Sequence, residues 1–324
     1  MKIIQYKNIL LIIGFAIMLG SAGIILSLGL NLGIDFTGGS LTEAAYEVRP
    51  DKADLETDIY ALNLGGYSLR RTVDEAGRDG YILRTRDLSE SERLSVEEVV
   101  LAKGVNAELT RFTSIGPVIG DELREKAKWA IGGVVIVIVI YVSFAFMGVG
   151  KPVGSWVYGG ITIFVLIHDV LVPTALMSLL GHFAGVEVDV LFVMALLAVL
   201  GYSVNDTIVV FDRVRENLVK FRQEKKRMVK GEFGQKQEVI DYVFTKPFSE
   251  IVGLSVSETL LRSINTSATT FLAVLALYIF GGEVTNVFAL ILMAGVVAGT
   301  YSSVALASPL LVWYADRTAN KTEQ

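Results

Sequence analysis

The stretch VDVLFVMALLAVLGYSVNDTIVVF, at residues 188–211, is long and apolar enough to cross a lipid bilayer as a single α-helix. A bilayer core about 30 Å thick requires roughly 20 apolar residues in helical form. Near its end the stretch contains Asp206, an acid flanked by Asn205 and Thr207. The stretch therefore predicts a membrane helix with an ionisable side chain inside the bilayer.

Five further apolar runs predict that the chain crosses the membrane six times. These runs occupy residues 9–32, 129–146, 156–180, 260–280 and 284–314. The last run is too long for one straight span, so we expect its end to tilt or to leave the membrane. The first run exceeds the roughly 7–15 apolar residues of a cleavable signal peptide, which favours a retained anchor. A hydrophobic content of 52% and a mean hydropathy of +0.53 are typical of a membrane protein.

The distribution of Lys and Arg predicts which ends of the spans face the cytoplasm, because short cytoplasmic loops are enriched in these residues. The loop at about residues 212–257 contains ten of them, whereas the turns at 181–187 and 281–283 contain none. Both termini and the long loop are therefore expected to be cytoplasmic. Acidic residues interleave the basic ones and the net charge is -5, so nucleic acid is not an expected partner.

Charge returns at residues 36–126, between the first two spans, and predicts a soluble domain outside the cytoplasm. Ser89 and Glu92 have the spacing of a helix capping box. The expected order of elements is βαββαβ, which is typical of ferredoxin-like folds. Strands are expected at 41–48, 67–73, 81–86 and 107–114, and helices at 53–62 and 89–103.

The predicted fold class is thus a polytopic α-helical membrane protein, with six transmembrane helices and an inserted α+β ferredoxin-like extracytoplasmic domain. Residues 1–35 would supply the first span, residues 36–126 the domain, and residues 127–324 the other five spans. The cytoplasmic loop and the C-terminus belong to this last part.

The composition argues against enzymatic chemistry. The chain has no cysteine and only two histidines, His168 and His182, so thiolate chemistry is excluded and a zinc site is not expected. The domain shows no Ser-His-Asp set and no phosphate-binding loop. We therefore expect no metal, no cofactor and no catalytic activity, and a binding or lever role suits the domain better.

Two ionisable residues lie inside predicted spans at similar depth. Asp206 is in the fourth span and Arg262 in the fifth, each about one and a half turns from the expected cytoplasmic edge. A charged side chain in hydrocarbon costs at least about 2.5 kcal/mol, so such residues usually pair and often mark ion pathways. Two interpretations stay open. Asp206 could load and release a proton as its neighbour moves, or the two residues could form a static ion pair between helices, and Arg262 could extend its charge to the bilayer edge.

Polar side chains form a stripe on the fifth span. Lipid would not accept such a stripe, so we expect it to face other helices or a hydrated cavity. Its members follow helical spacing and are Arg262, Thr266, Thr269 and Thr270, with Ser263 and Ser267 alongside.

A second ionisable pair, His168 and Asp169, lies near the middle of the third span. Neighbouring residues point about 100° apart on a helix, so the two side chains need not touch. A proton relay and a structural hydrogen bond between helices are both compatible with the sequence. The same two roles are open for Asn205, Thr207 and Thr266.

Small residues mark sites of close helix packing. Gly295 and Gly299 form a GxxxG pattern in the last span. This pattern usually brings two helix backbones together, and it predicts packing rather than a cofactor site.

Four blocks of the chain, taken together, resemble the SecF family, the smaller membrane subunit of the SecD–SecF protein-export complex. The blocks are GIDFTGGS at 33–40, IGPVIGDEL at 115–123, GYSVNDTIVVFDRVREN at 201–217 and LRSINTSATT at 261–270. A glycine pair alone would be weak evidence, but four blocks in this order are specific. The similarity extends to the span count and to the position of the inserted domain.

The resemblance implies a function. The family belongs to the resistance-nodulation-division superfamily of proton-driven transporters, in which SecF and SecD each contribute six spans to a pseudo-symmetric bundle. Such a chain would assist export of unfolded preproteins emerging from the SecYEG channel and would use the proton-motive force across the cytoplasmic membrane. The partners implied are SecD, SecYEG, preproteins, protons and the lipid bilayer.

The resemblance also implies roles for single residues. By position, Asp206 corresponds to the proton-carrying acid and Arg262 to its charge partner, while a further acid would come from SecD. The domain would support preprotein handling. Four residues would shape the join between the first span and the domain, namely Gly33, Asp35, Gly38 and Gly39.

Two other functions compete with this one. Half of a small-molecule or lipid exporter of the same superfamily would usually have a larger extracytoplasmic region in a longer chain. A passive scaffold or assembly factor would use Asp206 and Arg262 only for packing. Hydrolysis inside the membrane ranks last, because Asp169 and Asp206 are only a distant candidate for a paired-aspartate site.

Overall fold

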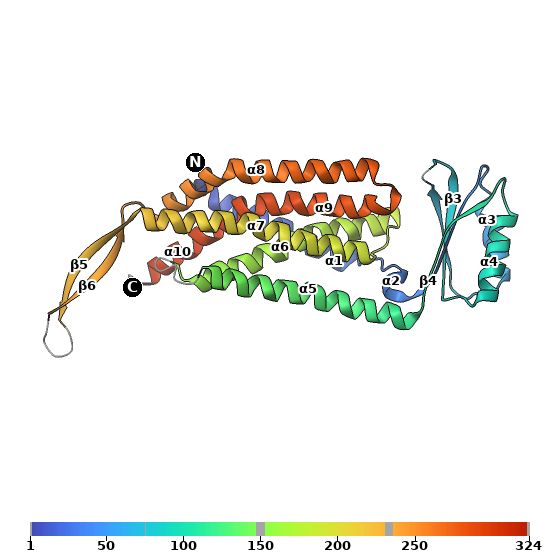
Figure 1. Cartoon of the computed structure of the whole chain (residues 1–324), viewed down its shortest axis with the longest axis horizontal. Helices are drawn as coiled ribbons and strands as arrows, with labels where there is room; N and C mark the ends of the chain where they lie inside the picture. Colours follow the sequence, from blue (N-terminus) through green and yellow to red (C-terminus); the bar gives the residue numbers. More distant parts are fainter. Residues whose placement is uncertain (1, 75, 147–152, 231–235, 323–324) are drawn as a thin grey trace.

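The computed structural model describes residues 2–74, 76–146, 153–230 and 236–322. Figure 1 shows an elongated molecule with a bundle of long helices in the middle, an α+β domain at one end and a two-stranded hairpin at the other. We call these the domain end and the hairpin end. Six helices in the described part are long and apolar enough to cross a membrane.

Several membrane helices continue beyond the apolar runs that predicted them, although α1 ends at Leu28 rather than residue 32, with Gly29 as its C-cap. For example, α5 begins at Pro117 rather than residue 129, and α8 begins at Phe248 rather than residue 260. Charged residues such as Glu and Lys are good helix formers, so a helix need not end where the hydrocarbon ends. The helices are α1 (Lys7–Leu28), α5 (Pro117–Ala145), α6 (Ser155–Ala184), α7 (Val190–Lys220), α8 (Phe248–Phe280) and α9 (Glu283–Ser302).

The sixth span is not one regular α-helix, and its length had excluded only a single straight span. A π-helical turn, η2 (Ser303–Ala307), separates α9 from α10 (Ser308–Thr322). Ser308 donates a hydrogen bond of 3.1 Å to the backbone oxygen of Ser303 inside this turn. Single π-helical turns often occur at functional sites.

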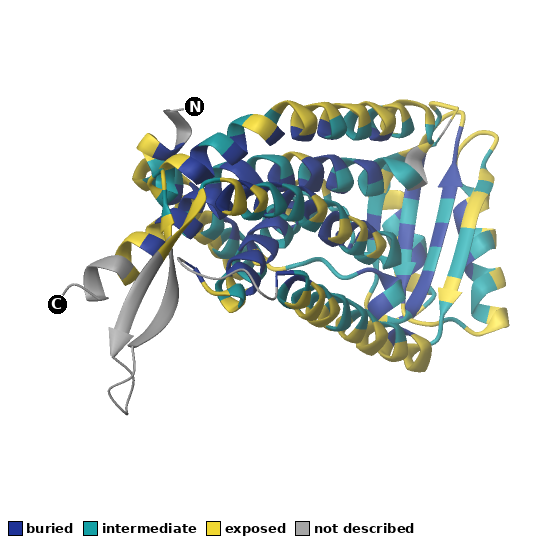
Figure 2. Ribbon diagram, turned by 60° about the vertical axis from the view of Figure 1, so that its left-hand side comes forward, coloured by how far each residue is buried: buried dark blue, intermediate teal, exposed yellow. Residues whose placement is uncertain are grey.

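The six helices differ in how far the chain buries them. About half of the apolar segment is buried in α6, in α7 and in the sixth span, whereas α1, α5 and α8 expose most of theirs. Figure 2 shows buried residues concentrated inside the bundle and exposed residues along its outer helices. The outer helices therefore have surfaces available for lipid or for a partner.

The GxxxG pattern brings α9 against α7. A Cβ atom added to Gly295 would lie 2.0 Å from Cγ2 of Val199, and one added to Gly299 would lie 2.9 Å from Cβ of Ser203. Two helix backbones can approach this closely only because these positions lack side chains.

We expect Gly295→Leu to destabilise the bundle by about 1–3 kcal/mol, because the new side chain would overlap Val199. Thermal unfolding of the detergent-solubilised protein measures this change. Gly132→Leu is a matched control, since nothing lies within 4 Å of a Cβ at Gly132 on α5. Equal unfolding temperatures for the two variants would contradict the close α7–α9 contact.

The domain has the predicted ferredoxin-like topology. Its four strands are all antiparallel and lie in the order β2-β3-β1-β4. The capping box formed by Ser89 and Glu92 is present at the start of the second domain helix. The elements are β1 (Gly39–Ala45), α3 (Lys52–Ala61), β2 (Ser68–Val73), β3 (Asp79–Thr85), α4 (Glu90–Ala102) and β4 (Glu108–Ile115).

The sheet of the domain lies between its two helices and the bundle (Figure 1). Its outer face packs on α3 and α4 through a core that includes Tyr46, Leu55 and Leu83. Strand residues alternate between faces. Arg70 and Arg84 therefore lie on the opposite face, which points at the bundle.

The loop predicted at residues 212–257 is largely regular structure. Helix α7 continues to Lys220, and an antiparallel hairpin of β5 (Arg222–Lys230) and β6 (Lys236–Phe244) follows before α8 begins. The hairpin projects away from the bundle (Figure 1). The connection between the fourth and fifth spans is therefore largely regular, which its charge could not indicate, because a solvated loop and a solvated hairpin can have the same composition.

Candidate functional site

Asp206 lies inside the bundle, where three helices meet. Its side chain on α7 is 4% exposed, and Oγ of Ser267 on α8 donates to its Oδ2 at 3.5 Å. Ser267 itself accepts hydrogen bonds from the hydroxyl of Tyr202 at 2.9 Å and from that of Thr300 on α9 at 2.7 Å. The hydroxyl of Thr300 also lies 2.6 Å from the backbone oxygen of Val296, so its single hydrogen serves one of these two acceptors at a time.

The carboxyl group of Asp206 has few donors for a buried acid. The bond from Ser267 is at the long limit of hydrogen-bond geometry. Ser263, one turn before Ser267, is also buried and lies close enough to the acid to stabilise its charge, although its hydroxyl falls outside strict hydrogen-bond geometry among the described residues. A buried carboxylate with so little support is unfavourable. The site therefore suits a carboxyl that is neutral during part of a cycle.

Arg262 lies near Asp206 but does not pair with it. Its side chain is exposed on the surface of α8, and no ion pair joins it to Asp206 in the part of the chain that the structure describes. Ser263, the next residue, turns inward instead, as the rotation of about 100° per residue requires. Arg262 still contributes to the electrostatic surroundings of Asp206. Arg262 thus lies near Asp206, but no direct pairing is observed among the described residues, and their similar depth in a bilayer stays a prediction.

The polar stripe of α8 does not face the other helices of this chain. Arg262 and Thr269 are exposed, and Thr266 and Thr270 are half-buried. The three threonines satisfy their hydroxyls on their own helix, each donating at 3.0 Å to the backbone oxygen four residues earlier. On the inward face of α8 the chain covers Ser263 and Ser267 instead. That the rest of the stripe faces other helices or a hydrated cavity stays a prediction.

The two neighbours of Asp206 differ in their placement. Asn205 is exposed, whereas Thr207 is buried and donates at 3.5 Å to the backbone oxygen of Ser203. Among the described residues, no hydrogen bond joins Asn205 or Thr207 to the carboxyl group of Asp206. A relay through these two residues therefore has no support in the observed hydrogen bonds.

His168 and Asp169 form a second buried polar cluster. Both side chains are fully buried on α6, and Nδ1 of His168 lies 2.8 Å from Oδ1 of Asp169. The other carboxyl oxygen, Oδ2, accepts hydrogen bonds from Ser203 on α7 and, at 2.8 Å, from Ser302 on α9. Nε2 of His168 is hydrogen-bonded to the hydroxyl of Tyr301. The adjacent residues therefore do touch, and three helices meet at the pair.

A cavity of about 700 Å³ opens between α8 and the sixth span. Its wall is mostly apolar, but four hydroxyl-bearing side chains reach it: Ser263, Ser267, Thr300 and Tyr301. Ser267 contacts Asp206, and Tyr301 contacts His168. The cavity thus borders the immediate partners of both buried clusters.

The block at residues 33–40 joins α1, α5 and α7 at the domain end. Oδ2 of Asp35 accepts the backbone N–H of Val190 at 2.9 Å, at the first residue of α7, and Gly33 donates its N–H to the backbone oxygen of Val188 at 2.8 Å. Gly38 and Gly39 have φ values of +69° and +123°, which favour glycine. A Cβ on Gly38 would also lie 2.8 Å from Cα of Pro117, where α5 begins.

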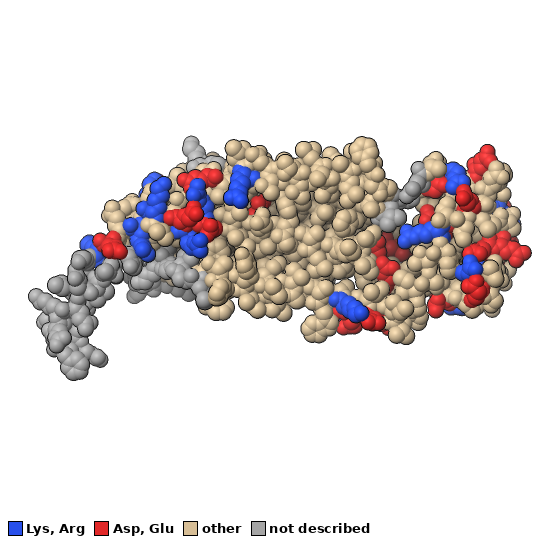
Figure 3. Space-filling view, viewed as in Figure 1, with Lys and Arg blue, Asp and Glu red and all other residues tan. Residues whose placement is uncertain are grey.

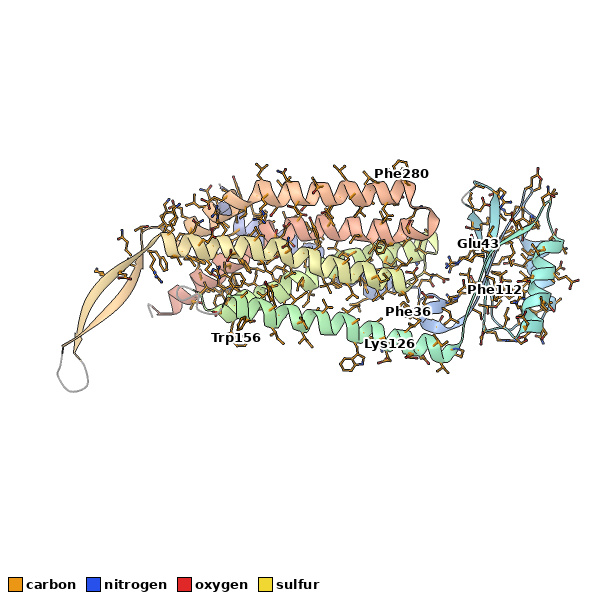
Figure 4. The ribbon with its side chains drawn as sticks, viewed as in Figure 1. Phe36, Glu43, Phe112, Lys126, Trp156 and Phe280 are labelled. Atoms are coloured by element: carbon orange, nitrogen blue, oxygen red, sulfur yellow. The ribbon has the colours of Figure 1, made fainter. Side chains whose placement is uncertain are left out.

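Two arginines of the domain hold the turn between α6 and α7. Nη1 of Arg84 lies 3.0 Å from Oε1 of Glu187 and also donates to the backbone oxygen of Leu32 at 3.0 Å. Arg70 donates to the backbone oxygen of Gly185 and lies 3.8 Å from the same carboxylate. Figure 4 shows the neighbouring Phe36 at this junction between bundle and domain. We call Arg70, Arg84 and Glu187 the junction cluster.

The side chains that could bind a metal ion are scattered in the described part of the chain. Within the described ranges, no three His, Asp or Glu side chains are grouped so as to hold a metal ion. The chemistry that the buried clusters offer is the binding and transfer of protons, since both contain carboxyl groups and one contains an imidazole.

Comparison with known families agrees with this arrangement. The profile for the protein export membrane protein SecD/SecF, C-terminal, matches residues 95–317, and that for the SecD/SecF GG motif matches residues 23–47. The chain belongs to the SecD/SecF family. Both buried clusters lie within the C-terminal match, and the glycines that join the domain to the bundle lie within the GG motif.

Relatives in the family are named as translocase subunits. The chain is 36% identical to the protein translocase subunit SecF of Sebaldella termitidis, over 96% of this chain and 91% of that protein. It is 33% identical to subunit SecDF of Thermus thermophilus, over 92% of this chain and 36% of that protein. The crystal structure of SecDF from Thermus thermophilus superposes with a TM-score of 0.79 at 29% identity, covering 98% of this chain and 39% of that one. The chain thus spans a little over a third of these longer SecDF proteins.

The sequence alone indicated some of the residues at the buried clusters and did not indicate others. Asp206 and Arg262 stand out because charge is rare inside a membrane span. The partners of the buried acids are Ser, Thr and Tyr, which are common in spans and carry no signal of their own. Such residues could have been found only through helical spacing, as Ser263 and Ser267 were.

Proposed function

We propose that this chain is a SecF-type subunit of a protein translocase that uses the proton-motive force to promote movement and release of preproteins across the cytoplasmic membrane. The observation that carries the proposal is Asp206, a buried and weakly supported acid at the meeting of three helices, in a family whose relatives are named as translocase subunits. Membrane-buried acids in transporters commonly carry protons.

Proton binding at Asp206 would change the contact between α7 and α8. With the acid charged, the hydroxyl of Ser267 would donate to it across the 3.5 Å that separates the two oxygens. Protonation removes the charge and gives the acid a donor of its own, so the hydroxyls of Ser267 and Ser263 are free to rearrange. A local charge change of this kind can bias a larger two-state movement.

A SecD-type partner would cover the polar stripe and the cavity wall of α8. Arg262 and the threonines of the stripe are turned away from the chain's own helices, where lipid would be an unfavourable neighbour. A partner helix with an acid at this depth would pair with Arg262. The six helices of this chain would then form half of the transport bundle.

The charge distribution favours a cytoplasmic hairpin end and an extracytoplasmic domain. Figure 3 shows charged side chains near both ends of the molecule and an uncharged band between them. The exposed aromatic residues Trp156 and Phe280 lie toward opposite ends of the bundle (Figure 4). Trp and Tyr side chains are enriched at membrane surfaces. Lys and Arg are enriched in cytoplasmic loops.

The domain would handle unfolded preproteins as they leave a SecYEG channel. Its inner face is linked to the α6–α7 turn through the junction cluster. Helices α6 and α7 carry the two buried clusters, so movement of these helices would reach the domain without passing through a flexible loop.

Reconstitution tests the proposed function directly. Vesicles that contain the chain, a SecD-type partner and a SecYEG channel should release a translocated preprotein faster with a proton gradient than without it. The channel and motor alone serve as the control and should show no such acceleration. Equal release rates with and without this chain under a full gradient would overturn the proposal.

A further inference from the structure

The cluster around His168 and Asp169 plays no part in the function proposed so far. If His168 is neutral with its proton on Nδ1, the observed contacts let it donate from Nδ1 to Asp169 and accept at Nε2 from Tyr301. Asp169 then accepts three hydrogen bonds, from His168, Ser203 and Ser302. The cluster is therefore well satisfied while it carries one negative charge and binds no extra proton.

One side of this cluster leads to the cavity between α8 and the sixth span. Tyr301 contacts Nε2 of His168 and also lines the cavity wall, whereas His168 and Asp169 have no exposed surface. The next residue after Tyr301 in the chain is Ser302, which donates a hydrogen bond to Asp169. The π-helical turn at Ser303–Ala307 follows directly. The interrupted helix thus holds both contacts of the cluster on that side.

The other side of the cluster leads to the helix of Asp206. Ser203 donates to Asp169 from α7, and it precedes Asp206 by three residues, which places the two on the same face of the helix. Ser203 also contacts the position of Gly299 on α9. A change in the charge of Asp169 would therefore act, through Ser203, on the packed contact between α7 and α9 beside Asp206.

We propose that His168 and Asp169 form a second proton-binding centre of this bundle, which exchanges protons with the cavity through the hydroxyl of Tyr301. In the forward step, the phenol gives its proton to Nε2 of His168 while its oxygen takes a proton from a hydronium ion in the cavity. Tyr301 is unchanged, His168 becomes imidazolium, and the carboxylate of Asp169 balances the charge. Release is the reverse step. This inference rests on the proposed function and adds a second site to it.

Few other titratable groups surround the pair. Helix α6 packs against α1, α5, α7, the sixth span and α10. In the central part of the bundle, the titratable groups on these helices are Tyr202, Asp206 and Tyr301. The other titratable groups lie nearer the helix ends, within residues 121–128 and at Tyr141 on α5, within residues 212–216 on α7, and within residues 314–317 on α10. A change in the protonation state of His168 should therefore respond mainly to Asp206.

Isotope labelling can follow His168 alone, because the chain has only two histidines. His182 is exposed near the end of α6, so His182→Gln provides a background with a single histidine. In this variant of the chain, placed in lipid nanodiscs with its partner, the ¹⁵N signals of labelled His168 should change fully from neutral imidazole to imidazolium as the pH falls. Adding Asp206→Asn should displace the midpoint of this change.

A transport measurement complements the titration. His168→Gln keeps a donor and an acceptor but cannot bind a proton, and Tyr301→Phe removes only the hydroxyl. Both should reduce gradient-driven preprotein release to the gradient-free rate. Thr174→Val is the matched control, since it removes a hydroxyl on α6 that only bonds the backbone oxygen of Val170 at 2.7 Å.

The outcomes separate this inference from the function beneath it. If His168 stays in one protonation state from acid to alkaline pH, the cluster is a structural network and the inference is wrong. The same conclusion follows if Asp206→Asn leaves the midpoint of the His168 titration unchanged. If Asp206→Asn leaves release unchanged, the proposed function fails, while the ¹⁵N titration still decides whether the pair binds a proton. Release by His168→Gln at the parent rate would also overturn the inference.

Discussion

Asp206→Asn should abolish the acceleration of preprotein release by a proton gradient and leave the chain folded and assembled with its partner. The amide has nearly the shape of the acid and can still accept from Ser267, but it cannot bind a proton. Because a buried carboxylate with one long hydrogen bond is replaced by a neutral group, the free energy of unfolding should change little. Release with the gradient should fall to the gradient-free rate, measured in reconstituted vesicles.

Asp212→Asn is the matched control for this variant. Asp212 lies on the same helix but is half-exposed at the hairpin end, where it pairs with Arg215 at 2.5 Å. Exposed pairs of this kind contribute little to stability. Asp212→Asn should therefore release preprotein at the parent rate. Full gradient stimulation in Asp206→Asn would show that the acid only packs, and the scaffold interpretation would then gain.

Arg262→Met extends the same experiment to the stripe of α8. Since Arg262 is exposed and forms no ion pair with Asp206 in the described part of the chain, we expect the isolated chain to unfold at the parent temperature. Gradient-driven release by the assembled complex should nevertheless be lost. A large loss of stability in the isolated chain would contradict the outward placement of Arg262.

Breaking the junction cluster should uncouple the domain from the bundle. Arg84 and Glu187 are each about 20% exposed, so the pair is largely shielded from solvent. Arg84 also bonds the backbone of Leu32 and the hydroxyl of Thr37, the latter at 2.6 Å. We expect Arg84→Gln to weaken this contact by about 1.5–3 kcal/mol, the usual range for hydrogen bonds to charged groups. Gradient-driven release should fall toward the gradient-free rate.

Hydrogen exchange distinguishes uncoupling from unfolding in this variant. Faster exchange should be confined to the α6–α7 turn and to the facing strands β2 and β3, while the core around Tyr46 and Leu55 stays protected. Arg86→Gln is the matched control, because it breaks an ion pair with Glu92 inside the domain. If Arg84→Gln released preprotein at the parent rate, the junction cluster would have no part in coupling.

The architecture could be read from the sequence because it depends on local composition. Hydropathy identified the six spans, and the alternation of strands and helices identified the ferredoxin-like domain, including the capping box at Ser89. The ends of α5, α7 and α8 could not be read in this way. Hydropathy reports where hydrocarbon ends, whereas a helix ends where its backbone hydrogen bonds and capping do.

The site could be read only in part. The sequence by itself determined that Asp206, Arg262, His168 and Asp169 are ionisable groups within membrane helices. Only the tertiary structure decided that Arg262 faces outward, because one residue of helical rotation separates it from the inward Ser263. Likewise, the partners of Asp169 lie on α7 and α9, 34 and 133 residues away along the chain. Spacing along one helix cannot report contacts that the packing of several helices creates.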